Sequence, residues 1–341
     1  MRFLIAHPGP DFSVKDVYAG WVEALRDLGH TVIEFNLGDR IAFYDSAHID
    51  VGGAWRKAVT GEKNVIELAM NGLAGALYKV RPHVLLSVSS FWTDTGLLDH
   101  ARRTGTRVVL LHTESPYEDE RQLKLASHAD LNLVNDPTNI EVYRATAPTL
   151  YCPHAYRPSV HRPGPSTAEP SDLVFVGTGY PSRVEFFEAL DLEGLRVALG
   201  GNWMRLPQGS PLRRYVVHSI DECLDNAEAV DLYRASKVGV NLYRREAEAE
   251  HLLLGATMGP REIEMAATGL FFIRDPRPEG DDVLSMLPTF ADADEASELI
   301  RWYVTHDSAR NRLAAAAREA VADRTFTAHA GQLLRLLDPK E

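Results

Sequence analysis

Two side chains of opposite charge, Arg261 and Glu264, lie three residues apart at the start of a predicted helix. The helix follows Gly259-Pro260, and proline suits the first helical position because its missing N–H would have no partner there. Residues three apart share one helix face. The unpaired N–H groups and the positive dipole end attract phosphate. A cation for phosphate beside a carboxylate for sugar hydroxyls is what a nucleotide-sugar site needs.

Further candidates for donor binding follow predicted strands in the C-terminal half. The Gly-x-Gly turn comes between a strand and a helix, where glycine lets the backbone approach a diphosphate closely. An arginine on the helix after the turn is a second phosphate ligand or a surface residue. An asparagine at a later strand end is either a ligand or an Asx turn. In order, these candidates are Gly177, Thr178, Gly179, Arg183 and Asn241.

Polar residues also follow the predicted strands of the N-terminal half. Transfer with inversion needs a base that takes the proton of an acceptor hydroxyl. Retaining transfer on this kind of site needs none, because the donor phosphate can take the proton. The candidate bases are Asp11, Asp94, His112 and Glu114, each of which is otherwise a turn or cap residue. Phe91 and Trp92 either stack on a sugar or base or anchor a packed loop.

No metal site is expected. Asp292-Ala293-Asp294 has the DxD spacing of metal-dependent transferases, but Asp292 reads as the cap of a helix with Glu295 three residues later. The two cysteines, Cys152 and Cys223, fit no zinc or redox spacing, and we interpret them as packed thiols.

Composition excludes several classes of protein. The net charge of −12 opposes a large nucleic-acid footprint, although a local basic cleft remains possible. No apolar run reaches the roughly 20 residues that span a bilayer. The apolar start, 3–6, is too short for a signal peptide, so we expect a cytoplasmic protein.

Alternating strands and helices occur twice along the chain. Near-continuous apolar strands are typical of parallel, doubly wound α/β sheets. A Pro-rich segment separates the two series, and ligands bind beyond the carboxyl ends of such strands. Residues 36–62 look less regular, with a break at Gly52-Gly53. The predicted parts are an acceptor-side domain over 1–158, a linker over 159–171 and a nucleotide-sugar-binding domain over 172–324.

The second half resembles the group 1 glycosyltransferases of the GT-B fold, in particular the CgeB-like (spore maturation) branch. The stretches that carry this resemblance are Val174–Arg183, Val238–Tyr243, Arg261–Gly269 and the closing helices Trp302–Leu333. The resemblance implies two Rossmann-like domains that face each other across a cleft. It also implies that Glu264 binds ribose and that a helix over 325–341 returns to the first domain. Relatives often carry another Glu eight residues earlier, where this chain has Ala256.

The predicted function is transfer of a sugar from a nucleotide diphosphate sugar to an acceptor hydroxyl, with no cofactor. UDP is predicted from its frequency in the family. Acceptors in the branch include glycans, small molecules, proteins and modified bases in phage DNA. The alternatives are a nucleotide-sugar epimerase on the same fold and a non-catalytic nucleotide-sugar binding module.

Overall fold

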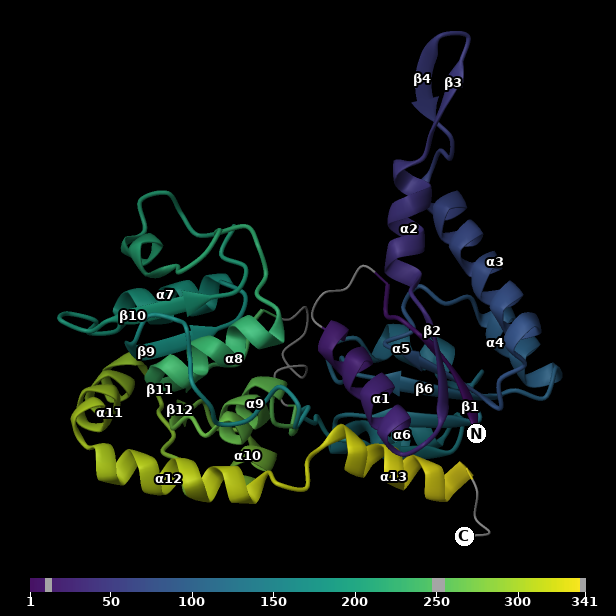
Figure 1. Ribbon diagram of the computed structural model, residues 1–341. Helices are drawn as coiled ribbons and strands as arrows, with labels where there is room; N and C mark the ends of the chain where they lie inside the picture. The colour runs from purple at the N-terminus through teal and green to yellow at the C-terminus, as the bar shows by residue number, and fades with distance from the viewer. Residues whose placement is uncertain (10–13, 247–254, 338–341) are drawn as a thin grey trace. The chain divides into compact units, whose positions relative to one another are not determined.

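The computed structural model describes residues 1–9, 14–246 and 255–337. It divides into two compact units, each with its own parallel sheet (Figure 1). The N-terminal unit comprises Met1–Pro153 and Phe326–Glu341, and the C-terminal unit comprises His154–Thr325. The sequence-based boundaries were 158/159 and 324/325.

The N-terminal unit is built on six parallel strands in the order β2-β1-β5-β6-β7-β8. The strands are β1 (Arg2–Ala6), β2 (Thr31–Phe35), β5 (Val84–Val88), β6 (Arg107–His112), β7 (Leu131–Val134) and β8 (Thr149–Tyr151). The helices are α1 (Lys15–Asp27), α2 (Leu37–Ser46), α3 (Glu62–Val80), α4 (Thr95–Arg103), α5 (Asp119–Ala126), α6 (Ile140–Arg144) and α13 (Phe326–Leu337). A short 3₁₀ turn, Pro137–Asn139, precedes α6.

Helix α13 comes from the far end of the sequence and packs on α1. The closest approach is at Gly20, where a Cβ atom would lie 2.1 Å from Cδ2 of Phe326. Gly20 is therefore the residue that lets the Phe326 ring lie against α1. Phe326 itself is 4% exposed, so the contact belongs to the packed interior.

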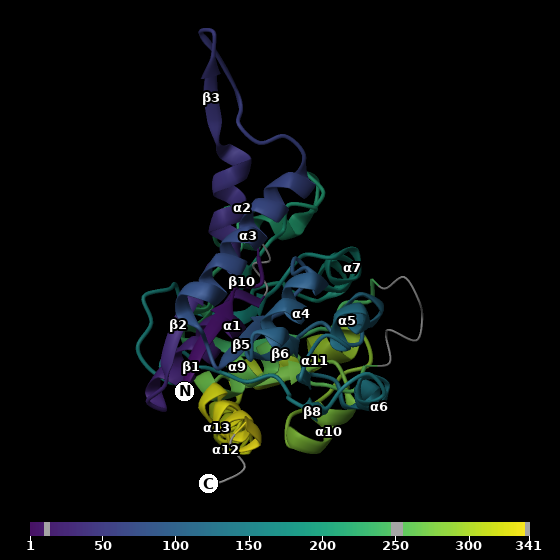
Figure 2. The ribbon, with the colours of Figure 1, turned by 90° about the vertical axis from the view of Figure 1, so that its right-hand side faces the viewer.

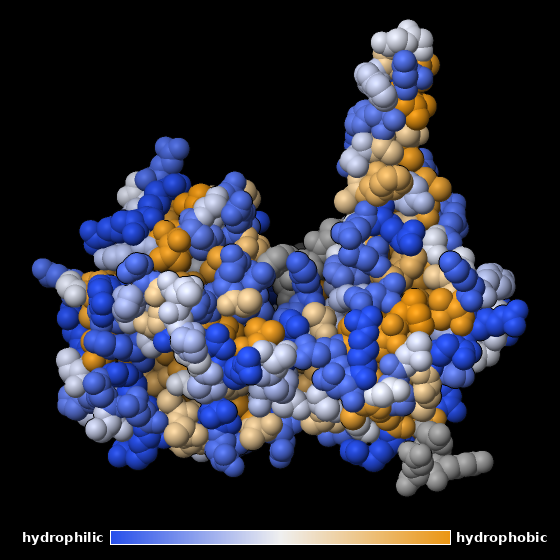
Figure 3. Space-filling model, viewed as in Figure 1, coloured by the Kyte–Doolittle hydropathy of each residue, from blue (hydrophilic) through white to orange (hydrophobic). Residues whose placement is uncertain are grey.

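A two-stranded antiparallel hairpin projects from the N-terminal unit (Figures 1 and 2). It consists of β3 (His48–Val51) and β4 (Ala54–Lys57), and all eight residues are exposed. The turn is Gly52-Gly53, with φ of 64° and 86°, as the tightest hairpin turns require. Hydrophobic residues lie among hydrophilic ones along it (Figure 3). Its exposed large side chains include Ile49, Val51 and Trp55, of which Trp55 is 75% exposed. The segment predicted to be irregular thus holds α2 and this hairpin.

The C-terminal unit has four parallel strands in the order β10-β9-β11-β12. The strands are β9 (Ser171–Val176), β10 (Val197–Gly200), β11 (Ser236–Asn241) and β12 (Phe272–Arg274). The helices are α7 (Pro181–Ala189), α8 (Asn226–Ala235), α9 (Pro260–Thr268), α10 (Pro278–Val283), α11 (Ala293–Thr305) and α12 (Asp307–Ala320), with a 3₁₀ turn at Pro211–Tyr215. Within the described residues, no helix has the length and apolarity needed to cross a membrane.

Two glycine-to-alanine substitutions test the packing of α13. We expect Gly20→Ala to lower the free energy of unfolding by about 1–3 kcal/mol, because its methyl group overlaps the Phe326 ring. Gly75→Ala in α3 is the matched control, since nothing lies within 4 Å of its added Cβ. It should raise stability by about 0.5–1 kcal/mol through helix propensity. Urea unfolding followed by circular dichroism measures both, and an unchanged Gly20→Ala protein would contradict the packing.

Candidate functional site

The carboxyl ends of β9, β11 and β12 lie along one edge of the C-terminal sheet, because all its strands are parallel. Ligands bind beyond this edge in open α/β sheets. Helix α9 begins beside it, since the ring of Tyr243, two residues after β11, lies 3.5 Å from the position of a Cβ on Gly259. The residues that the sequence singled out for donor binding come from this edge and from the first turns of α7 and α9.

Helix α9 is held firmly in place by its own sequence. Ile263, Met265 and Ala266 are at most 2% exposed and belong to the core of the unit. Pro260 occupies the first helical position, and Gly269 ends the helix with a φ of 86°. The predicted start of the helix at Pro260 is confirmed, and the helix ends at Thr268. A rigid helix of this kind fixes the direction of its polar side chains.

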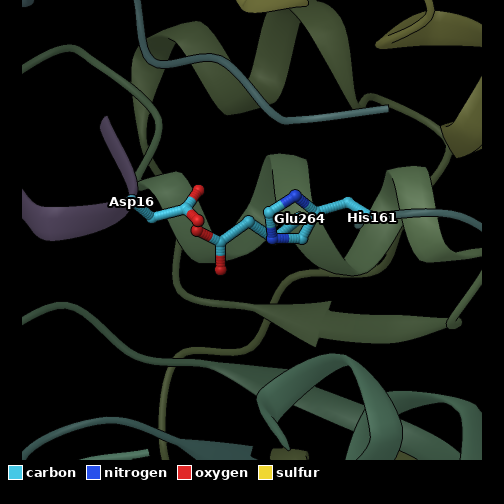
Figure 4. A group of neighbouring side chains, drawn as sticks. All are labelled: Asp16, His161 and Glu264. Atoms are coloured by element: carbon cyan, nitrogen blue, oxygen red, sulfur yellow. The ribbon is translucent and has the colours of Figure 1, made fainter. Parts of the chain in front are cut away.

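Glu264 lies at the centre of a polar cluster. Its Oε2 accepts a hydrogen bond from Arg261 Nη1 at 2.5 Å, and its Oε1 accepts one from Asn226 Nδ2 at 3.2 Å. Asn226 also accepts from Arg261 at 3.2 Å, which closes a three-membered ring of contacts. The ring of His161 and the Glu264 carboxylate approach within 4.8 Å (Figure 4). This cluster joins α8, α9 and the segment that precedes β9.

The carboxyl group of Glu264 is ionised although only 5% of the residue is exposed. Burial raises its pKa, but the charges of Arg261 and His161 and the hydrogen bonds from Arg261 and Asn226 outweigh burial and leave the pKa below its usual value. An ionised carboxylate offers about four acceptor sites, of which the hydrogen bonds described use two. Glu264 is thus able to accept hydrogen bonds from two more donors.

Asn241 ends β11 and has a buried amide without a partner. The residue is 7% exposed, and no described residue accepts a hydrogen bond from its Nδ2. Its Oδ1 lies 4.0 Å from the position of a Cβ on Gly259, so the amide lies beside the start of α9. An unsatisfied buried donor is costly and calls for a ligand or an ordered water.

The Gly-x-Gly turn has a role different from the predicted one. The N–H groups of Gly177 and Gly179 donate to the carbonyls of Gly200 and Asn202, at 3.0 and 2.8 Å. Neither donor is therefore available to a diphosphate. A Cβ on Gly179 would lie 2.4 Å from the ring of the buried Trp203, so this glycine serves close packing.

Arg183 likewise has main-chain partners. Its Nε and Nη2 donate to the carbonyl of Leu242, at 3.1 and 2.7 Å, and its Nη1 donates to the carbonyl of Thr178 at 3.0 Å. Burial lowers its pKa to about 10, which leaves it charged at neutral pH. In this structure Arg183 joins the end of β11 to the turn after β9. Its predicted role as a phosphate ligand would draw on its remaining N–H groups.

The candidate bases of the N-terminal unit lie in different environments. His112 is 1% exposed, its Nε2 lies 2.8 Å from Asn132 Oδ1, and burial lowers its pKa to about 4. A neutral, enclosed imidazole does not suit a base for a dissolved acceptor, so we set His112 aside. Asp94 is exposed and caps α4 by accepting the N–H of Leu97 at 3.2 Å. Glu114 is half-buried, and Asp11 lies outside the described residues.

Asp292 caps α11, as the sequence indicated. Its Oδ1 accepts the N–H of Glu295 at 2.9 Å. The Glu295 carboxylate in turn accepts the N–H of Ala291 at 2.8 Å. The DxD spacing at this position is therefore explained by helix capping.

Glu262 is a buried acid that the sequence interpretation did not single out. It is 0% exposed, and its Oε2 accepts hydrogen bonds from the N–H of Gly259 and the hydroxyl of Tyr243. Its Oε1 has no partner among the described residues. Burial raises its pKa to about 7, although the hydrogen bonds and two nearby arginines, Arg274 and Arg277, oppose the shift. The first turn of α9 thus holds a carboxyl group that titrates near neutrality.

Other members of the site were also missed. Asn226 follows Asp225, whose capping box with Glu228 was a readable signal for the start of α8. His161 lies in the segment predicted to be a linker, and it is 1% exposed. Its Nδ1 accepts the N–H of Arg157 at 3.2 Å. Only the tertiary structure brings these residues to Glu264.

Comparisons with known proteins bear on the family and the fold. Residues 183–335 match the model of a family described as glycosyl transferase-like. No curated protein matches the chain at the level of sequence. Among solved structures, the trehalose-6-phosphate synthase OtsA is similar with a TM-score of 0.65 and 13% identity over 99% of both chains.

Two further structures share the fold. HepE from Anabaena, in complex with UDP-glucose, has a TM-score of 0.60 and 10% identity over 98% of this chain and 100% of its own. A putative UDP-N-acetylglucosamine 2-epimerase from Listeria monocytogenes has a TM-score of 0.63 and 14% identity over 98% and 95%. The chain has the GT-B fold that its sequence predicted. The match to the glycosyl transferase-like family over residues 183–335 and the fold agree with the glycosyl transfer predicted from the sequence.

The raised pKa of Glu262 predicts a specific dependence of stability on pH. Its pKa of about 7 in the folded protein lies above the usual value of 4.5 for a glutamate. The stabilisation from the neutral form is therefore complete below about pH 4.5 and is lost as the pH rises through about 7. Glu262→Gln stays neutral at every pH. We therefore expect its free energy of unfolding to rise by about 1–3 kcal/mol relative to that of wild type as the pH is raised from 5 to 8.

Urea unfolding at both pH values measures this difference. Glu298→Gln is the control, because Glu298 is an exposed residue of α11 and should give the same difference at both pH values. A Glu262→Gln difference that does not change with pH would contradict the assignment.

Proposed function

We propose that this protein transfers a glycosyl group from a nucleoside diphosphate sugar to an acceptor hydroxyl, with the donor bound at the first turn of α9. The observation that carries the proposal is the pair of unused polar groups there. Glu264 is an ionised, buried carboxylate with acceptor sites to spare, and Asn241 is a buried amide donor with no partner among the described residues. A ribose diphosphate offers the complementary groups, hydroxyl donors and phosphate acceptors.

The ribose end of the donor fits Glu264. Vicinal hydroxyls donate two hydrogen bonds, and each oxygen of Glu264 accepts only one from the protein in the contacts described. Arg261 and Asn226 fix both oxygens, so the carboxylate is oriented before the ligand arrives. Such preorganisation lowers the entropic cost of binding. We also propose that Arg261 binds the diphosphate, as its sequence position predicts. Its second role is to orient the Glu264 carboxylate through their ion pair.

The diphosphate end fits the region between Asn241 and the start of α9. A helix N-terminus favours negative charge, and the amide of Asn241 adds a neutral donor. The carboxyl group of Glu262, which accepts the N–H of Gly259, would oppose an anion if it were ionised. Its raised pKa reduces that opposition, because the group is substantially neutral near pH 7. Donors already in place also stabilise the leaving diphosphate as charge develops on it.

Finer points belong to the proposal as well. UDP is the proposed nucleotide, supported by the UDP-glucose in the HepE structure. Membership of the CgeB-like branch and a cytoplasmic location stay predictions. Asp94 and Glu114 remain candidate bases for an inverting reaction, and a retaining reaction needs neither. The acceptor is the subject of the further inference below.

Titration of UDP and uridine into three proteins tests the donor site. We expect Glu264→Gln to weaken the binding of both ligands by about 10-fold or more, because both carry the ribose hydroxyls. Asn241→Asp is equal in size but adds a negative charge. We expect it to weaken the binding of UDP at least 10-fold and the binding of uridine much less, because uridine carries no phosphate. Isothermal titration calorimetry measures each dissociation constant.

Glu298→Gln serves again as the exposed control and should bind both ligands like wild type. Thermal melting of each variant shows whether it has kept its fold. If UDP bound equally well to wild type and Glu264→Gln, the donor site would not be here. Incubation of wild type with UDP-N-acetylglucosamine alone separates the rivals, since a new sugar isomer would favour the epimerase.

A further inference from the structure

A groove of about 1010 Å³ lies within the N-terminal unit, and none of the residues of the proposed donor site lines it. One wall is a face of α3, and the other is formed by the turn after β5 together with α4 and α5. Its lining residues are Glu62, Lys63, Ile66, Glu67, Met70, Asn71, Ala74, Tyr78, Phe91, Trp92, Thr93, Asp94, Leu97, His100 and Arg121. Both walls belong to one unit, so the groove is complete in that unit alone.

The floor and the sides of the groove differ in chemistry. Aliphatic side chains form the floor, where Met70 and Leu97 are 6% and 8% exposed. Aromatic rings flank it, with Tyr78 63% exposed and its ring centroid 5.3 Å from that of His100. A surface tyrosine beside a concave apolar floor is typical of a site that receives a flat ligand.

The turn that supplies the other aromatic residues has an unusual backbone. Ser89 and Ser90 follow β5 with φ of 60° and 35°, values that residues other than glycine rarely adopt. The two serines are 1% and 3% exposed, and Ser89 Oγ accepts a hydrogen bond from Thr113 at 3.2 Å. Backbone conformations of this kind persist where the surroundings enforce them, and they cluster at functional sites. Here they direct the chain into Phe91 and Trp92.

Trp92 is positioned by a second feature. A Cβ on Gly9 would lie 2.5 Å from Cδ1 of Trp92, and Gly9 itself has a φ of 94°. Two strand ends, those of β1 and β5, therefore combine to hold one indole at the groove. Arg121 fixes the neighbouring ring, since its guanidinium lies 4.2 Å from the centroid of Phe91 and donates to the Phe91 carbonyl.

Asp94 adds one polar group at the same end of the groove. Its Oδ1 accepts the N–H of Leu97, and no described residue donates to its Oδ2. The carboxylate follows directly on the turn that carries the two aromatic residues. A hydroxyl group on a ligand in the groove would have this oxygen as its acceptor.

From these features we propose that the groove binds the acceptor, and that the acceptor is a flat aromatic alcohol whose hydroxyl donates to Asp94. This inference rests on the proposed glycosyl transfer in one respect: only with that transfer is the molecule in the groove an acceptor. An aliphatic floor between aromatic rings suits an aromatic ring system better than a glycan, whose many hydroxyls would face Ile66, Met70 and Ala74. Among the aromatic side chains of the lining, we expect the rings of Tyr78 and Trp92 to contact it.

Binding of 4-methylumbelliferone, a flat phenol with its own fluorescence, tests the groove. We expect Ala74→Trp, which fills the groove from a half-buried position on α3, to weaken binding at least 10-fold. Leu68→Trp is the matched control, because Leu68 is an exposed residue of the same helix outside the groove, and it should bind like wild type. Tyr78→Ala, at an exposed position, should weaken binding about 3-fold or more without loss of fold.

The role of Asp94 is tested with 7-methoxy-4-methylcoumarin, which lacks the phenolic proton. Wild type should bind it several-fold more weakly than the phenol. The difference should vanish in Asp94→Asn, which keeps the ability to cap α4. Equal binding of the phenol to wild type and Ala74→Trp would overturn the site, and displacement of the phenol by maltotriose at similar concentration would overturn the aromatic class.

UDP binding to the same variants separates this inference from the proposed function. Ala74→Trp should bind UDP like wild type, because the donor residues lie in the other unit. Groove-dependent binding of the phenol without any binding of UDP to wild type would support the groove and overturn the glycosyl transfer. Binding of UDP to wild type with no binding of the phenol would support the glycosyl transfer and overturn the groove.

Discussion

The proposed donor site depends on one buried charge, the carboxylate of Glu264. Burial alone would favour its protonated form, and a protonated carboxyl would lose acceptor sites for hydroxyl groups. Arg261, one helical turn earlier, keeps it ionised at a distance of 2.5 Å. The ion pair does not have to stabilise the fold, since buried pairs often contribute little net stability. Its consequence is a charged acceptor in a fixed direction.

Two carboxyl groups on α9 thus differ in state although they lie two residues apart. Glu264 faces Arg261 and Asn226, and its pKa falls. Glu262 points the other way, toward Tyr243 and the start of the helix, and its pKa rises. The helix places them on different faces, so each meets its own surroundings. One chain segment therefore supplies an anion for hydroxyls and, beside a proposed phosphate position, a carboxyl group that is partly protonated near pH 7.

The sequence was informative where local rules decide the structure. Pro260 and Gly269 mark the ends of α9, Asp292 marks the start of α11, and apolar runs mark the buried parallel strands. It was misleading at Gly177 and Gly179, because a Gly-x-Gly turn has the same letters whether a ligand or a tryptophan ring approaches it. The hairpin at 48–57 was missed because all its residues are exposed and it has no alternating buried face to read. His161 and Asn226 join the site only through contacts between distant segments.

Hydrogen-bond partners separate the candidates better than residue type does. Gly177, Gly179 and His112 were reasonable candidates from their places at strand ends, and Arg183 from its place on the following helix. Each of them has partners that belong to the fold. Asn241 was equally ambiguous in the sequence, because an Asx turn would have used its side chain within the loop. Its amide instead stays buried and without a partner among the described residues, at the one helix start that the charged pair also marks. A polar group that the fold leaves unsatisfied costs free energy unless a ligand or water completes it, so the Asn241 amide supports the proposed binding site.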